Sequence, residues 1–166
     1  MEIKVKDKLI LIDEEDCIYT NLPSSSIFIN SHGYAVVNTW DKVKKKNIKR
    51  NLHRYILGIT NKNIDIDHIN GDKLDNRKCN LRIATASENA VNSKMRVNNT
   101  SGYKGVFWHK HSGKWMASIT KNKKHIYLGL FESKHEAVKA YDTKAIELFG
   151  EFATPNMPQL SGVKPL

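Results

Sequence analysis

Short apolar runs separated by polar turns fill the first segment of the chain. Residues 9–12 are all apolar and predict a strand, which closes at the acidic turn 13–16. Runs 27–29 and 34–37 flank the polar turn 30–33, an arrangement that is typical of a β-hairpin. The pattern therefore predicts a set of short strands and turns at this end of the chain.

The middle of the chain alternates between helical and strand patterns. In chain order, the pattern predicts a short helix at 52–58 that ends at a glycine, a strand around 64–66, a polar loop at 70–76 and a strand near 81–83. Thr85 and Glu88 have the spacing of a capping box, so a helix is expected to begin there. That helix would carry Asn89 and Asn92 on one face, because residues three apart are neighbours on a helix.

Three strands and a helix are predicted after the loop-like linker 96–102, which is a candidate domain boundary. The strands lie near residues 105–109, 114–120 and 125–130, and the turns Ser112-Gly113 and Asn122-Lys123 separate them. Ser133 and Glu136 form a second capping box, which opens a helix that Gly150 ends. The fold class is therefore expected to be α+β, with a loosely ordered tail from Thr154.

The composition is that of a basic protein without a predicted membrane-spanning segment. Hydrophobic residues make up 40% of the chain, and no run approaches the roughly 20 apolar residues of a spanning helix. Charged residues interrupt the N-terminal segment, so we expect no signal peptide, no membrane partner and a cytoplasmic location. The net charge is +10, and no acidic residue occurs from Asn89 to Phe131. Such a surface favours a polyanionic partner.

Two features admit more than one interpretation. The run Lys44-Lys45-Lys46 predicts a basic turn that is either a solvated loop or a phosphate contact. Cys17 and Cys79 are far apart and belong to no CxxC motif, which argues against a four-cysteine zinc site or a disulfide framework. We expect both cysteines to be small core residues in a reducing compartment.

A chemically suggestive group follows the predicted strand at 64–66. Asp67 and His68 stand side by side, Asn80 lies twelve residues after His68, and Asn89 follows nine residues later. A phosphodiesterase needs a base to activate water and a cation held by oxygen ligands. His68 can be the base, and Asp67 and Asn89 can supply oxygens that suit magnesium or manganese. Asn80 can fix the loop that orients His68.

This group lies within a longer motif. The run Ile-Asp-His-Ile-Asn-Gly-Asp-Lys-Leu-Asp-Asn-Arg, followed by Asn-Leu-Arg and Ala-Thr-x-Ser-x-Asn, extends from Ile66 to Asn89. It resembles the HNH endonucleases of phages and mobile introns. The resemblance implies a ββα-metal finger with His68 as general base, Asp67 and Asn89 as ligands of one Mg²⁺ or Mn²⁺ ion, and Asn80 as the loop-positioning residue.

Two details of this resemblance concern neighbouring positions. The third named position of the motif is asparagine here rather than histidine, as in the intron-encoded branch of the family. The segment around His53 and Arg54 also resembles the helix that precedes the motif in that branch. Both residues are therefore candidate neighbours of the active site, although a helix facing its own core explains them equally well.

A second resemblance covers Thr100 to about Asn156. The segments Ser-Gly-Tyr-Lys-Gly-Val, Gly-Lys-Trp-Met-Ala-Ser-Ile, Leu-Gly-Leu-Phe and Glu-Ala-Val-Lys-Ala-Tyr-Asp resemble the APETALA-type DNA-binding domain of plant ethylene-response factors. The resemblance implies a three-stranded sheet in the DNA major groove with the helix packed behind it. The candidate DNA contacts are Lys104, Trp108, Lys110, Lys114, Thr120, Lys121, Lys123 and Lys124.

The basis of sequence recognition departs from the plant pattern. Plant domains place several arginines on the sheet, whereas no arginine follows Arg96 here, and lysine reads bases less sharply. The plant target sequence therefore cannot be carried over. Trp108 could touch sugar or thymine methyl groups or pack in the core, while Trp115 is expected to pack in the core.

These observations predict a DNA endonuclease of two domains. The nuclease domain would span 1–95, with strands over 1–50 and the motif core over 51–95, followed by a DNA-binding domain over 100–156 and a tail over 157–166. Acting on double-stranded DNA as a monomer or weak dimer, it would nick one strand and leave 5′-phosphate and 3′-hydroxyl ends. The alternative is a non-catalytic DNA-binding regulator with a vestigial nuclease scaffold, and an RNA-directed nuclease is disfavoured because no RNA-reading module is recognisable.

Overall fold

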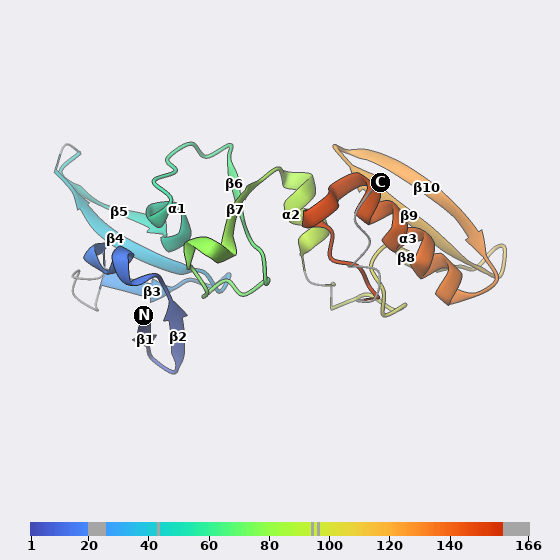
Figure 1. Ribbon diagram of the computed structural model, residues 1–166, viewed down its shortest axis with the longest axis horizontal. Coiled ribbons are helices and arrows are strands. Elements are labelled where there is room, and N and C mark those ends of the chain that lie inside the picture. The colour runs from blue at the N-terminus through green and yellow to red at the C-terminus, as the bar shows by residue number, and fades with distance from the viewer. Residues whose placement is uncertain (20–25, 43, 94, 96, 158–166) are drawn as a thin grey trace. The chain divides into compact units, whose positions relative to one another are not determined.

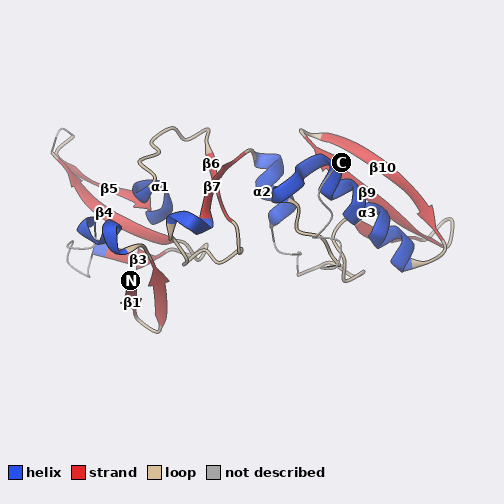
Figure 2. Cartoon of the chain, viewed as in Figure 1, coloured by secondary structure: helices blue, strands red, loops and turns tan. Residues whose placement is uncertain are grey.

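The computed structural model describes residues 1–19, 26–42, 44–93, 95 and 97–157 (Figure 1). This part of the chain is a mixed α/β protein with four small antiparallel sheets and few helices (Figure 2). The chain divides into two compact units, Met1–Ala84 and Thr85–Leu166. Each unit has a hydrophobic core of its own.

The first unit begins with two small sheets. Its strands are β1 (Glu2–Val5) paired with β2 (Lys8–Leu11), and β3 (Ile27–Ile29), β4 (Ala35–Asp41) and β5 (Lys46–Asn51) in the order β3-β4-β5. A 3-10 helix, Glu14–Tyr19, follows β2. The predicted strand at 9–12 and the predicted hairpin are confirmed. β1 and β5 were not predicted, because lysines and other polar residues break their apolar pattern.

A short helix and a two-stranded ribbon complete the first unit. Helix α1 (Leu52–Ile56) is followed by Gly58 at φ 65°, a left-handed conformation in which glycine ends the helix without a Cβ clash. Strand β6 (Asp65–His68) pairs antiparallel with β7 (Leu81–Ala84), and the 3-10 helix Lys78–Asn80 precedes β7. The predicted helix and both predicted strands are confirmed.

The second unit contains a three-stranded sheet covered by a helix. Its elements are α2 (Ala86–Asn92), β8 (Val106–His109), β9 (Lys114–Lys121), β10 (Lys124–Phe131), α3 (Lys134–Phe149) and the 3-10 helix Gly150–Phe152. The sheet order is β10-β9-β8, and α3 packs along it as Figure 1 shows. The three strands, both capping boxes and the glycine after α3 are as predicted.

Helix α2 lies in the second unit, whereas the sequence placed the domain boundary in the linker 96–102. Val91 on α2 is buried in the same core as Val138 and Phe149 of α3. The backbone N–H of Asn122 donates to Ser87 Oγ at 2.9 Å, which fixes the first turn of α2. The helix therefore joins the second unit because its apolar residue is buried there.

The C-terminal tail and the cysteines differ in part from the predictions. The predicted loose tail is wrong for 154–157, because the buried Asp142 carboxylate accepts hydrogen bonds from the backbone N–H groups of Asn156 and Met157, each at 2.8 Å. Residues 158–166 lie outside the described part of the chain. Cys79 is exposed rather than in the core, and the side chain of Cys17 is not among those described. No described helix is long and apolar enough to span a membrane.

Candidate active site

The ribbon β6–β7 places Asp67 and His68 in the interior of the first unit. They are the last two residues of β6, and each keeps about 5% of its surface exposed. The strand register sets Asp67 opposite Arg82 and His68 opposite Leu81. Two polar side chains this deeply buried require partners nearby, and each of the two has its own set.

The ring of His68 contacts an asparagine and two other rings. Its Nε2 lies 3.5 Å from Oδ1 of Asn76, and the Asn76 side chain is itself held by a hydrogen bond to Leu74 O at 3.0 Å. The ring of His53 stands edge-on to His68 with centroids 5.1 Å apart, and Tyr34 lies 6.1 Å away. Because an amide oxygen only accepts, the contact with Asn76 favours the tautomer that carries its proton on Nε2.

The electrostatic environment keeps His68 neutral. Burial lowers the pKa of His68 below its ordinary value of 6.5, since the charged ring loses solvation. The bond to Asn76 and the carboxylates of Asp67, Asp72 and Asp75 oppose this shift without reversing it. An imidazole that is neutral at neutral pH can accept a proton from water.

Asn80 fixes the polar loop between His68 and β7. Its Oδ1 accepts from the backbone N–H of Asn70 at 3.0 Å, and its Nδ2 donates to the carbonyl of Asp75 at 2.8 Å. The Asp75 carboxylate is buried and accepts two bonds from Arg77 at 2.8 and 2.7 Å, which lower the pKa of Asp75. Asn80 thus acts on the loop, and Asn76 from that loop contacts His68.

The N-terminal strands support the same loop from another side. Leu11 on β2 donates its N–H to Leu74 O at 2.9 Å and accepts from the N–H of Asn76 at 2.8 Å. Lys73 donates to His32 O at 3.0 Å, and its ammonium lies 4.5 Å from the centre of the Tyr34 ring. The first fifty residues therefore hold the loop that presents Asn76 to His68.

Asp67 is oriented by an ion pair. The Nε and Nη2 atoms of Arg82 donate to Asp67 Oδ2 at 2.9 and 2.8 Å, and both side chains are largely buried. Sequence reasoning assigned no role to Arg82 or Asn76, although both lie within the quoted motif. The pairing of β6 with β7 sets Asp67 opposite Arg82, and this register, which the sequence does not show, brings an acid and a base together.

His53 and Arg54, the candidate neighbours, have different surroundings. His53 is buried beside His68 and Tyr34, and among the described residues its Nδ1 has no hydrogen-bond partner. Burial, reinforced by the ring of His68, lowers the pKa of His53 from 6.5 to about 3. Arg54 instead donates to the carbonyls of Ile64 and Asn61, so it braces the segment between α1 and β6.

Asn89 lies on α2, in the second unit. The C-terminal end of this helix is fixed by Lys104, whose ammonium donates to Val91 O at 3.0 Å and Ser93 O at 3.2 Å. Lys104 was expected to contact DNA, but in the structure its half-buried ammonium caps α2. Cations are favourable at this position because carbonyl groups without helical partners give the helix end a partial negative charge.

The remaining predicted DNA contacts fall into two groups. Lys121 donates to Leu148 O at 2.6 Å, so its ammonium caps the C-terminal end of α3, and its contact with DNA stays a prediction. Lys114 forms an exposed ion pair with Glu132. Four others are exposed on β8 and β10 or in the turns of the sheet, namely Trp108, Lys110, Lys123 and Lys124, and Thr120 is exposed on β9.

The two residues predicted as metal ligands, Asp67 and Asn89, both carry side-chain oxygen atoms. Among the described residues, no three His, Cys, Asp or Glu side chains form a group that could hold a metal ion. A ligand set of one carboxylate and one amide oxygen, as in Asp67 and Asn89, matches the oxygen preference of Mg²⁺ and Mn²⁺. The residue types therefore fit such an ion.

Known proteins resemble both halves of the chain. The family model described as HNH endonuclease matches residues 53–91, and the AP2 domain model matches residues 101–151. Over 113 residues the chain is 34% identical to an uncharacterized HNH endonuclease of Acanthamoeba polyphaga mimivirus, covering 65% of this chain and 58% of that protein. It is 36% identical over 88 residues to Protein 3.8 of Escherichia phage T7, covering 53% of this chain and 72% of that protein.

The second unit is also similar to plant proteins. An ethylene-responsive transcription factor of Arabidopsis thaliana is 43% identical over 58 residues, which is 34% of this chain and 14% of the plant protein. The chain thus spans somewhat more than half of the mimivirus protein and a small part of the plant factor. Both resemblances that the sequence motifs indicated are confirmed.

Proposed function

Since this chain belongs to the HNH endonucleases and carries an AP2 domain, we propose that it is a metal-dependent DNA endonuclease with His68 as general base. The environment of His68 carries the proposal. The ring is buried, its pKa is lowered, and its Nε2 lies 3.5 Å from Asn76 Oδ1. A neutral imidazole with a basic Nδ1 is the form that a general base needs at neutral pH.

The reaction we propose is hydrolysis of one phosphodiester bond in double-stranded DNA. His68 accepts a proton from a water molecule, and the water oxygen forms a bond to phosphorus as the bond to the 3′ oxygen breaks. The departing oxygen takes up a proton, so the products carry 5′-phosphate and 3′-hydroxyl ends. With one His68 in each chain, a single encounter nicks one strand.

The proposed metal ligands are Asp67 and Asn89, as the HNH motif implies. A single Mg²⁺ or Mn²⁺ ion bound by them would stabilise negative charge on the scissile phosphate and the departing oxygen. Arg82 holds Oδ2 of Asp67 and so fixes the orientation of the carboxylate. The chain order of β6, β7 and α2 supports assigning these three elements to the ββα-metal finger of the family.

Asn80 and the N-terminal strands have a positioning role in this proposal. They hold the loop 70–76, and that loop carries Asn76, whose side-chain oxygen lies next to Nε2 of His68. We assign the nuclease domain to 1–95, the DNA-binding domain to 100–156 and the tail to 157–166. The second domain delivers DNA to the first.

A plasmid-nicking assay tests this proposal. Wild type should convert supercoiled plasmid to the open-circular form with Mg²⁺ and leave it intact with EDTA. His68→Ala should lower the nicking rate by roughly 10²–10⁴-fold, which is the usual contribution of a general base. His135→Ala is the matched control, because His135 is an exposed histidine on α3 and its loss should leave nicking unchanged.

The alternative function, a non-catalytic regulator, predicts another result. If wild type and His68→Ala both bind DNA and leave supercoiled plasmid equally untouched in Mg²⁺ and in Mn²⁺, the endonuclease proposal is wrong. End-labelling of the nick tests the product assignment, because a 5′-phosphate must be removed before a kinase can label that end.

A further inference from the structure

The three-stranded sheet of the second unit has one covered face and one exposed face. Side chains alternate between the faces along a strand, and Val106, Ala117 and Ile119 point toward α3 in the buried core. The register pairs then define an outer sheet face on the other side. Its members on β8, β9 and β10 are Phe107, His109, Lys114, Met116, Ser118, Thr120, His125, Tyr127 and Leu130.

An apolar row crosses the middle of this outer sheet face. Phe107 pairs with Met116, and Met116 pairs with Leu130, so the three side chains lie next to one another across three strands. Phe107 and Leu130 are 39% and 38% exposed. Large apolar side chains that remain accessible on neighbouring strands indicate an interaction surface.

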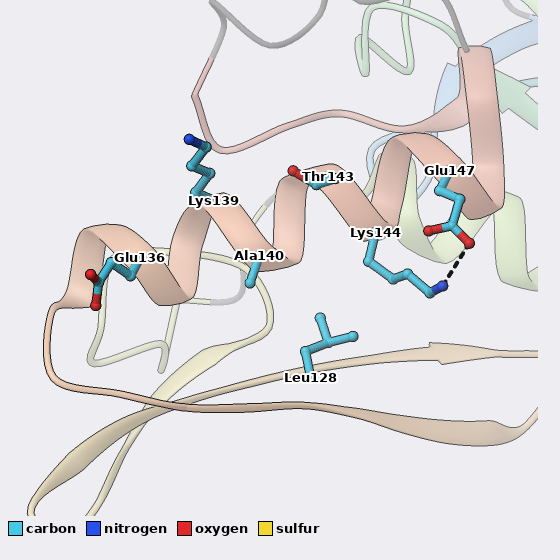
Figure 3. A pocket seen from close by; sticks show the side chains of 7 residues that line it. All are labelled: Leu128, Glu136, Lys139, Ala140, Thr143, Lys144 and Glu147. Atoms are coloured by element: carbon cyan, nitrogen blue, oxygen red, sulfur yellow. Dashed lines mark hydrogen bonds and ion pairs between the residues drawn. The ribbon is translucent and has the colours of Figure 1, made fainter. Parts of the chain in front are cut away.

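Charge identifies the kind of partner that this surface fits. The strands β8–β10 contain no acidic residue, and Lys110, Lys123 and Lys124 are exposed at their ends. The groove between α3 and β10 carries Glu136 and Glu147 beside Lys139 and Lys144, as Figure 3 shows. On the outer sheet face Lys114 pairs with Glu132, while Lys110, Lys123 and Lys124 are exposed at the strand ends, and this excess of lysines favours a polyanion on that side.

The two tryptophans do not belong to this surface. Trp108 and Trp115 are register partners whose rings meet edge-to-face with centroids 5.1 Å apart. Trp115 packs against the core under α3. Trp108 therefore lies on the helix side of the sheet, and it cannot be the side chain that the outer sheet face offers to DNA.

We propose, building on the DNA endonuclease assignment, that the row Phe107–Met116–Leu130 reads thymine C5-methyl groups in the major groove. The thymine methyl is the one apolar group among the base edges displayed in that groove, and a β-ribbon fits there. No arginine follows residue 96, so the bidentate contact that selects guanine is absent from this domain. The domain therefore prefers A·T-rich duplexes and distinguishes thymine from uracil.

Binding of the full chain to a pair of DNA duplexes tests this inference. The two duplexes share one A·T-rich sequence, and the second carries deoxyuridine in place of every thymidine, which removes only the methyl groups. Titrations in EDTA keep both duplexes intact. Each buried methyl is worth about fourfold in affinity, so we expect the thymine duplex to bind roughly four- to twentyfold more tightly.

Substitutions in the row Phe107–Met116–Leu130 test whether these side chains cause the difference in affinity between the two duplexes. Phe107→Ala and, separately, Met116→Gln should bring the thymine-to-uracil affinity ratio close to one while lysine-dependent binding persists. Trp40→Ala is the matched control, because Trp40 is an exposed aromatic residue on β4 of the first unit and its loss should keep the ratio. Circular dichroism confirms that each variant is folded, and either folded row variant suffices for the comparison.

The outcomes separate this inference from the proposed function. Equal binding of the two duplexes by wild type would overturn the methyl readout, even if magnesium-dependent nicking is intact. The methyl readout by this row would also be overturned if Phe107→Ala and Met116→Gln both keep a thymine-to-uracil affinity ratio above one. Other groups would then contact the methyl. Loss of nicking in His68→Ala with a preserved affinity ratio would support both proposals.

Discussion

Gly105 allows a test of how the second unit is built. Its φ is +67°, and a Cβ at this position would lie 2.0 Å from Cε2 and 2.1 Å from Cδ2 of Tyr141 and 2.6 Å from Ser118 O. Neither neighbour can yield easily. The Tyr141 ring is buried in the core, and the Ser118 peptide is held by its N–H bond to Gly105 O at 2.9 Å.

Gly113 provides a matched control for the same substitution. Its φ of +64° is nearly that of Gly105, but nothing lies within 4 Å of the Cβ that alanine would add. Both Gly→Ala variants therefore carry the same left-handed backbone cost of roughly 1–2 kcal/mol. Gly105→Ala adds an overpacking cost of about 1–3 kcal/mol or more. We expect it to lower the free energy of unfolding by about 2 kcal/mol more than Gly113→Ala, the middle of that range.

Amide hydrogen exchange measures this difference in the intact chain. A chain of two units need not unfold in one step, so slowly exchanging amides of β9 and β10 report on the second unit alone. A difference of about 2 kcal/mol corresponds to roughly 30-fold faster exchange in Gly105→Ala than in Gly113→Ala. Amides of β4 in the first unit should be equal in both variants. If both variants accelerate β9 and β10 equally, the argument from the Tyr141 contact is refuted.

Three further predictions concern buried polar groups. The pKa of His53 is 6.5 in the unfolded state and about 3 in the folded state. Below pH 6.5 protonation of His53 therefore favours the unfolded state, and the free energy of unfolding declines. The loss should reach about 2 kcal/mol at pH 5, and the urea midpoint of His53→Phe should vary less between pH 7.5 and 5 than that of wild type. Lys104→Met should speed hydrogen exchange of the α2 amides about tenfold, because the C-terminal carbonyls of α2 lose their cation. It should leave the salt dependence of DNA binding unchanged, whereas loss of the exposed lysine in Lys124→Ala should reduce that dependence. Asp142→Ala should destabilise the second unit by roughly 3 kcal/mol, measured by exchange at β9, because it leaves the N–H donors of Asn156 and Met157 without their buried acceptor; an unchanged rate would contradict this role.

Local sequence signals anticipated most elements of the fold. Both capping boxes and the turns at Gly113 and at Asn122-Lys123 are where the sequence places them. These signals depend on residues within one turn of each other, so no distant partner is needed to form them. β1 and β5 escaped prediction because their pairing with β2 and β4 sets their conformation, while their own residues alternate weakly.

The candidate site was anticipated in its residues but not in its contacts. Asp67 and His68 stand out by their motif, yet their partners Arg82 and Asn76 depend on the register of β6 with β7 and on the conformation of the loop 70–76. A register cannot be read from either strand alone, because a shift by one residue exchanges the faces of a strand.

The sequence by itself determined the motif, most of the order of helices and strands, and the absence of acidic residues from Asn89 to Phe131. Tertiary structure alone decided which lysines are available for DNA and which row of side chains faces outward. Lys104 and Lys124 look alike in the sequence, but the first caps α2 and the second is exposed. The reason is that a lysine's role depends on where carbonyl groups end up after folding, and packing between distant segments fixes those positions.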